Sequence, residues 1–360
     1  VGSPPGAAAI GEAGGRLANF ASNDYLGLAN DPRIVEAARE AMARYGFGAG
    51  ASPLVTGHTR EHEQAEAAFA AFTGNARALL FASGYAANLG ILAALADRES
   101  AVFADRLDHA CLVDGARLSR AAFHRYPHGD LAVLERQLGD SRARTRLIAT
   151  DAVFSMDGDV APLPALLALA ERFDAWLVVD DAHGIGVLGD GRGTLAHFGL
   201  ASDRIVHMAT LGKALGGYGA FVTGAPEVVE WLLQRARPYV FSTALPPAAA
   251  AAATAALSIV AAEPQRIRRL HARIAALREG LAAAGVASDS PTAIHPVVVG
   301  EPARALQVSA RLRARGHLVP AIRPPTVPAG TSRLRVSLSS EHSPAQVHAL
   351  VRDLAQALAA

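Results

Sequence analysis

The chain has 360 residues, of which 51% are hydrophobic and 19% are charged, and its net charge is +1. This length and composition indicate a globular protein with a large core and about two domains. The near-neutral charge, with the arginines spread along the chain, excludes a dedicated nucleic-acid-binding protein.

The single cysteine, Cys111, excludes an internal disulfide framework and is typical of a reducing compartment. We expect it to be a small buried or half-buried thiol. The N-terminal residues contain neither the basic nor the apolar region of a signal peptide, so we expect a cytoplasmic protein. The first residue is not methionine, which is compatible with a natural N-terminus further upstream.

The first well-marked element is a helix over residues 31–45, with Asp31 as N-cap, Pro32 at the first helical position and Gly46 after its end. From residue 76 onward, short apolar runs alternate with helical patterns such as residues 86–96 and 164–173. The expected strands are residues 79–82, 101–104, 147–150, 176–180, 205–210 and 220–223. Runs that are apolar on both faces and separated by helices predict an α/β fold with a mostly parallel sheet.

The C-terminal part predicts a smaller α+β domain. The apolar stretch 244–262 is mostly alanine and begins with prolines, which favours a buried helix over a membrane span. Further expected elements are helices over 264–284, 303–315 and from Pro344, and strands over 295–299, 317–321 and 334–338. Residues Val347, Leu350, Val351, Leu354 and Leu358 form one apolar stripe of the last helix. We expect an N-terminal segment (1–45), a large domain (46–262) and a small domain (263–360).

Two strand ends carry residues suited to catalysis. Residues 176–180 form an apolar strand that ends in Asp180, and His183 follows three residues later. Lys213, the single lysine of the chain, follows the next expected strand. Ligands of open parallel sheets bind beyond the carboxyl ends of the strands, so these side chains are expected at a ligand site. A lysine amine can act as a nucleophile, whereas arginine cannot.

An aspartate and a lysine at neighbouring strand ends match the needs of pyridoxal phosphate. The lysine forms the Schiff base, and the aspartate keeps the pyridine nitrogen protonated. The turn Ser83-Gly84-Tyr85 opens a helix that could bind the phosphate, and Thr210 adds a hydroxyl. The flat rings of Tyr85 and His109 are suited to cover the cofactor.

Two other sequence motifs suggest rival functions. His58 and His62 lie in an H-x-x-E-H sequence, which is a zinc motif, so a zinc peptidase is an alternative hypothesis. Gly212-Lys213 lacks the other residues of a phosphate-binding loop, because His207 and Ala214 occupy the required positions. A further alternative is a protein that binds the cofactor without catalysing a reaction. No metal is expected if the pyridoxal phosphate hypothesis holds.

Taken together, these residues resemble the α-oxoamine synthases, which are pyridoxal phosphate enzymes of fold type I. The resemblance runs from about residue 20 to the C-terminus. It rests on seven segments: 22–28 (SNDYLGL), 81–85 (FASGY), 104–109 (ADRLDH), 153–159 (VFSMDGD), 179–184 (VDDAHG), 210–213 (TLGK) and 323–330 (RPPTVPAG).

The resemblance implies roles for individual residues. Lys213 would carry the Schiff base, Asp180 would pair with the pyridine nitrogen and His109 would stack on the ring. The other implied cofactor contacts are Ser83, Gly84, Tyr85, Ser155, His183 and Thr210, with Ser242 and Thr243 reaching the phosphate from the partner subunit of a homodimer. The implied substrate contacts are Asn23, Ser52, Arg323, Thr326 and Arg335. The family's N-terminal helix, with its substrate-binding arginine, has no match here.

The resemblance also implies the reaction. Residues 323–328 favour the branch of the family that condenses L-alanine with a pimeloyl thioester in biotin biosynthesis, with loss of carbon dioxide. The acyl donor would be pimeloyl-CoA or a pimeloyl carrier protein. A glycine C-acetyltransferase or another α-oxoamine synthase is the alternative within the family.

Overall fold

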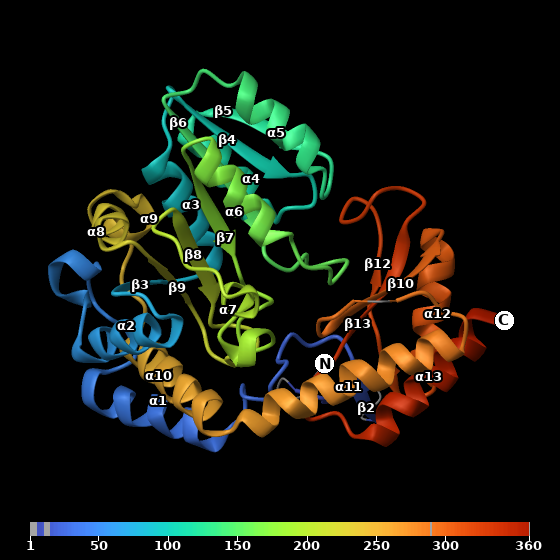
Figure 1. Cartoon of the computed structure of the whole chain (residues 1–360). Coiled ribbons are helices and arrows are strands. Elements are labelled where there is room, and N and C mark those ends of the chain that lie inside the picture. The colour runs from blue at the N-terminus through green and yellow to red at the C-terminus, as the bar shows by residue number, and fades with distance from the viewer. Residues whose placement is uncertain (1–5, 11–14, 289, 360) are drawn as a thin grey trace. The chain divides into compact units, whose positions relative to one another are not determined.

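The computed structural model describes residues 6–10, 15–288 and 290–359 and contains two compact units (Figure 1). Among the described residues, the smaller unit comprises the chain up to Asp31, Ser155–Asp159, and the chain from Ala262 onward. The larger unit comprises Pro32–Phe154 and Val160–Ala261. The expected division at residues 45 and 262 remains a prediction about domains.

The larger unit is built on a seven-stranded sheet of order β3-β9-β8-β7-β6-β4-β5. Its strands are β3 (Arg77–Phe81), β4 (Ser100–Asp105), β5 (Ala122–Tyr126), β6 (Thr145–Asp151), β7 (Ala175–Asp180), β8 (Ile205–Thr210) and β9 (Ala220–Gly224). β9 is antiparallel to both of its neighbours, β3 and β8, and all other neighbouring strands in this sheet are parallel. The predicted α/β fold with a mostly parallel sheet is confirmed.

Helices cover both faces of this sheet (Figure 1). Val178 belongs to a core with residues of α3, α4 and α8, whereas its neighbours Leu177 and Val179 belong to a core with α5 and α6. Because successive strand residues point to opposite faces, the two cores lie on opposite sides. The helical segments are α1 (Pro32–Tyr45), η1 (Pro53–Gly57), α2 (Arg60–Thr73), α3 (Gly84–Leu95), α4 (Ala110–Ser119), α5 (Leu131–Asp140), α6 (Leu163–Arg172), η2 (Gly189–Gly191), α7 (Thr194–Phe198), α8 (Pro226–Arg235), α9 (Arg237–Val240) and α10 (Pro247–Ala262).

The smaller unit contains two three-stranded sheets, β1-β2-β11 and β10-β13-β12. The elements are β1 (Ala8–Ile10), β2 (Arg16–Asn19), α11 (Pro264–Ala283), β10 (Ile294–Gly300), α12 (Pro302–Ala314), β11 (His317–Leu318), β12 (Ala321–Ile322), β13 (Ser332–Ser337) and α13 (Pro344–Ala359). The expected single strand 317–321 is wrong. β11 pairs with β2 and β12 pairs with β13, and Pro320 between them has no N–H to continue a ladder.

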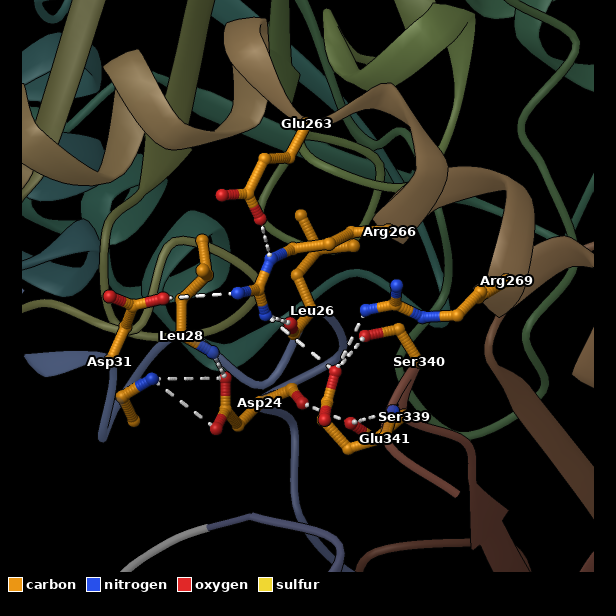
Figure 2. A network of polar contacts seen from close by, with 11 residues as sticks. Asp24, Leu26, Leu28, Asp31, Glu263, Arg266, Arg269, Ser339, Ser340 and Glu341 are labelled. Atoms are coloured by element: carbon orange, nitrogen blue, oxygen red, sulfur yellow. Dashed lines mark hydrogen bonds and ion pairs between the residues drawn. The ribbon is translucent and has the colours of Figure 1, made fainter. Parts of the chain in front are cut away.

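A network of charged groups around Arg266 of α11 holds several segments of the smaller unit together (Figure 2). The guanidinium of Arg266 contacts Asp31 at 3.0 Å and Glu263 at 2.7 Å, and it donates to the carbonyl oxygen of Leu26 at 3.1 Å. Glu341 lies 3.6 Å away. Arg266 thus joins the start of α11 to the N-terminal segment and to the chain before α13.

Within the described part of the chain, no single helix is both long and apolar enough to cross a membrane. The helices α10 and α11 meet that criterion only when they are taken together across their break. Ala253, Ala256 and Leu257 of α10 are buried, as the alanine-rich composition predicted.

Candidate active site

The site is built from the carboxyl ends of β7 and β8, which are parallel neighbours in the larger unit. Asp180 is the last residue of β7 and its side chain is buried. One carboxylate oxygen accepts a hydrogen bond from the side-chain amide of Asn88 at 2.7 Å, and the other accepts from the backbone N–H of Ala182 at 3.0 Å. These two donors fix the direction of the carboxylate.

Lys213 lies in the turn after β8. Its Nζ is 2.8 Å from Nε2 of His183, which follows β7. His183 is buried and Lys213 is half-buried. The structure therefore brings the lysine and the histidine into direct contact, in the segments that follow two adjacent strands.

The turn that carries His183 is held by the next aspartate, Asp181. Its fully buried carboxylate accepts from the backbone N–H and hydroxyl of Thr194 at 2.7 and 2.6 Å, and it contacts Nε2 of His207 at 3.2 Å. A Cβ atom on Gly184 would collide with the side-chain oxygens of Asp181 and Thr194. The sequence Asp-Asp-Ala-His-Gly is thus a rigid turn, and its first aspartate and its histidine are directed to the site.

The residues expected to bind the phosphate of the cofactor lie where α3 begins. Ser83 is the N-cap of α3, and its hydroxyl oxygen accepts from the N–H of Ala86 at 3.1 Å. A Cβ atom on Gly84 would lie 3.6 Å from Cβ of Thr210, so the start of α3 adjoins the end of β8. The first N–H groups of a helix have no acceptor within it, so this corner can bind an anion. The ring of Tyr85 is partly exposed, and its hydroxyl donates to Asp114 of α4.

His109 is the N-cap of α4, because its Nδ1 accepts from the N–H of Cys111 at 3.3 Å. The same nitrogen lies 2.8 Å from Sγ of Cys111. The ring of His109 is exposed, as a side chain that stacks on a ligand must be before the ligand binds. Cys111 is buried as expected, and burial raises the pKa of its thiol, which also receives a hydrogen bond from Asn88.

Three of the implied substrate and cofactor residues lie together in the smaller unit. Arg335 of β13 is buried, and it donates to the side-chain oxygen of Asn23 at 3.2 Å and to the carbonyl oxygen of Ser155 at 2.6 Å. Arg323 and Thr326 lie in the exposed segment between β12 and β13, where the N–H of Thr326 donates to the carbonyl of Arg323. The roles of these five residues remain predictions.

The remaining implied residues lie in two loops of the larger unit. Ser52 precedes η1, and Ser242 and Thr243 follow α9 with exposed side chains. The N–H of Ala244 donates to the carbonyl of Ala51 at 2.9 Å, so the two loops lie side by side. The roles of these residues also remain predictions.

The zinc alternative fails at His62. Its Nδ1 accepts from the N–H of Thr59 at 3.1 Å, and its Nε2 contacts the carbonyl oxygen of Leu245 at 2.6 Å. Both ring nitrogens therefore have protein partners, which leaves none for a metal ion. His58 pairs with Glu66 at 2.9 Å, and that contact raises the pKa of His58.

Two site residues were missed by the sequence analysis. Asn88, on the first turns of α3, is fully buried and binds both Asp180 and Cys111. Asp151, the last residue of β6, pairs in register with Asp180. Asp151 could have been found from the sequence, because it directly follows the expected strand over residues 147–150. Asp180 has a similar place at the end of the expected strand over residues 176–180. Nothing in the sequence around Asn88 marks it.

Sequence comparison decides the family. The family of class I and II aminotransferases matches residues 16–354. An 8-amino-7-oxononanoate synthase of Chromobacterium violaceum is 57% identical over 333 residues, which cover 92% of this chain and 87% of that protein. One of Methylococcus capsulatus is 54% identical over 343 residues, covering 94% and 89%. The chain belongs to the 8-amino-7-oxononanoate synthases.

The enzyme is therefore a pyridoxal phosphate-dependent acyltransferase of fold type I, and its family acts in biotin biosynthesis. A serine palmitoyltransferase structure with a pyridoxal phosphate internal aldimine has a TM-score of 0.94 at 32% identity, covering 99% of this chain and 90% of that chain. The 8-amino-7-oxononanoate synthase of Francisella tularensis has a TM-score of 0.83 at 30% identity, covering 94% and 97%. Structural similarity thus shows the shared fold, and sequence identity separates the branches.

Proposed function

We propose that this chain condenses L-alanine with a pimeloyl thioester to give 8-amino-7-oxononanoate, carbon dioxide and the free thiol. One carbon–carbon bond forms between the alanine α-carbon and the thioester carbonyl, the carbon–sulfur bond breaks, and the alanine carboxyl group leaves as carbon dioxide. The observation that carries the proposal is the contact between Lys213 and His183 beside the buried Asp180.

The donor set fits pyridoxal phosphate. Asp180 offers a buried carboxylate with a fixed direction for the ring nitrogen, Lys213 offers an amine for the aldehyde, and the start of α3 offers N–H groups for the phosphate. When bound, the cofactor supplies an electron sink for the negative charge that develops at the alanine α-carbon.

The protein's own groups then bind substrate and move protons. Nζ of Lys213 takes the α-proton of alanine and later returns a proton to the same carbon. His183 lies 2.8 Å from Nζ and orients the amine. The guanidinium fork of Arg335, held by Asn23 and Ser155, is suited to bind the carboxylate of alanine through two oxygens.

The proposal includes a homodimer. Ser242 and Thr243 are exposed in this chain, beside the strongly exposed ring of Phe241. Exposed apolar side chains next to candidate ligand contacts are typical of a surface that a partner covers. The partner would be a second copy of the chain, with Ser242 and Thr243 reaching the phosphate of its neighbour.

A product assay tests the proposal. The purified protein is incubated with pyridoxal phosphate, L-alanine, and either pimeloyl-CoA or a pimeloyl carrier protein, and the products are identified by mass spectrometry. We expect 8-amino-7-oxononanoate with one or both acyl donors. Glycine with acetyl-CoA is the control pair. Turnover with the control pair and none with alanine would instead favour a glycine C-acetyltransferase.

A further inference from the structure

Three neighbouring strands of the large sheet end in aspartate at the edge where the candidate site lies. Asp105 ends β4, Asp151 ends β6 and Asp180 ends β7. Asp151 and Asp180 are direct partners in the parallel ladder, and their side chains are 4% and 6% exposed. Two carboxyl groups are therefore buried side by side where the cofactor site needs one negative charge.

The surroundings of the two carboxyl groups are unequal. Asp180 accepts hydrogen bonds from Asn88 and Ala182, as described above. Asp151 accepts one, from the backbone N–H of His109 to Oδ2 at 3.2 Å. Its Oδ1 is buried and has no hydrogen-bond partner within the described residues. Burying an oxygen that has no hydrogen-bond partner costs less free energy when the carboxyl group is neutral than when it is a carboxylate.

Two of the three charges that face Asp151 also favour its neutral form. They come from Asp180 on β7, from Asp108 before α4 and from Lys213 after β8. Asp108 also accepts a hydrogen bond from the backbone N–H of Asp151 at 2.9 Å. Burial, followed by the two aspartates, raises the pKa of Asp151 well above its ordinary value, and the opposing effect of Lys213 is smaller. Burial also raises the pKa of Asp108, but both oxygens of Asp108 accept hydrogen bonds, from the N–H groups of Asp105 and Asp151, whereas Asp151 has one such donor.

We propose that Asp151 is a positioning residue of the active site, held as a neutral carboxylic acid beside the charged Asp180. Because Asp151 is neutral, Asp180 is the carboxylate that faces the ring nitrogen of the cofactor, and no second negative charge lies near Lys213. Its Oδ2 also fixes the backbone at His109, whose ring is expected to stack on the cofactor. The assignment of these neighbours to the cofactor rests on the proposed function.

The protonation state can be measured without the cofactor. The variant Asp151→Asn is a neutral isostere whose amide oxygen can still accept from His109. The infrared difference between wild-type and Asp151→Asn apoprotein at neutral pH should contain the carbonyl stretch of a protonated carboxyl group. A carboxylate band in its place would overturn the proposal, whatever the reaction of the enzyme is.

Asp108→Asn is the matched control. If Asp151→Asn does not fold, wild-type apoprotein should still show the protonated carboxyl band, and the band should persist in Asp108→Asn. Its absence from the wild type, or its loss in Asp108→Asn, places the proton elsewhere and refutes the assignment.

The effect on the cofactor is measured by titrating the visible absorbance of bound pyridoxal phosphate with pH. In Asp151→Asn the midpoint should match that of the wild type, and the cofactor Kd should change by less than about threefold, because no charge is removed. Asp180→Asn should raise that Kd by at least about tenfold. If Asp151 is ionised, its replacement would lower the midpoint by about one pH unit or more, because a negative charge near Lys213 would be lost.

Discussion

At the scale of single residues, the site depends on side chains that no other residue type can replace. Positive charge in this chain is supplied by arginine except at Lys213. Arginine is never usefully deprotonated, so it cannot form a covalent link to an aldehyde or take a proton from carbon. The contact of Nζ with His183 places this one amine in a defined direction.

The single lysine makes its role directly testable. Borohydride reduction of the protein with bound pyridoxal phosphate should label the peptide that contains Lys213 and no other side chain, which peptide mass spectrometry detects. In Lys213→Arg the label should disappear and turnover should fall by at least about 1000-fold, because the group that transfers the proton is lost. Bound cofactor without a label on Lys213 would contradict the proposed site.

Asn88 is predicted to stabilise the charge of Asp180. The hydrogen bond from its amide to the carboxylate is 2.7 Å long and fully buried. Hydrogen bonds to charged groups contribute about 1.5–3 kcal/mol, so Asn88→Ala should raise the cofactor Kd by about 10- to 100-fold. The Kd is measured by absorbance titration. Asn75→Ala, which removes a side-chain amide that contacts Thr223, is the control and should leave the Kd unchanged.

At the scale of elements, the start of α11 owes its position to charge rather than to apolar packing alone. Arg266 is 14% exposed and Asp31 is 5% exposed, so their ion pair is largely removed from water. The same guanidinium reaches Glu263, Glu341 and the carbonyl oxygen of Leu26 (Figure 2). A buried ion pair with additional hydrogen bonds is costly to break on one side, because the remaining charge stays buried.

We therefore expect Arg266→Ala to lower the free energy of unfolding by about 3 kcal/mol. Urea denaturation, followed by circular dichroism, gives the change. The control is Arg39→Ala, which removes an exposed ion pair with Glu36 and should leave the free energy of unfolding almost unchanged. Equal effects of the two substitutions would show that the Arg266 network does not stabilise α11.

Three strands that the sequence did not reveal were missed for two different physical reasons. β5 has the sequence Ala-Phe-His-Arg-Tyr, and three of its five residues are exposed because it is an edge strand. It therefore lacks the continuous apolar run that marks the central strands. β11 and β12 have two residues each, and their pairing with β2 and β13 depends on tertiary contacts.

At the scale of the whole molecule, sequence reasoning found the catalytic groups that follow strands, because the carboxyl edge of a parallel sheet is a known place for ligands. Asp180, His183 and Lys213 were located in this way. Asn88 could not be, because its importance comes from a contact with a residue 92 positions away. Asp151 was overlooked although it follows an expected strand, and only its pairing in register with Asp180 had to come from the structure.

Buried histidines of the smaller unit should make the protein sensitive to acid. His342 stacks on Phe20, and its Nδ1 accepts from the N–H of Ser339. His295 lies fully buried in β10. Burial lowers the pKa of each of these two histidines to about 4, compared with an ordinary value near 6.5. Between these values the unfolded chain binds more protons than the folded chain does.

The free energy of unfolding should therefore have its full value above about pH 6.5 and fall as the pH decreases towards 4. The decrease is up to about 1.4 kcal/mol per pH unit for each histidine. Hydrogen exchange with mass spectrometry, recorded across this range, should show loss of protection in peptides of β13 and α13. His342→Asn keeps an acceptor for Ser339 without the titrating ring, so its protection should depend less on pH. His348→Asn, an exposed position on α13, should behave like the wild type. If His342→Asn is as sensitive to acid as His348→Asn and the wild type, His342 is not the source of the sensitivity. A group that no longer titrates cannot bind the additional proton on unfolding.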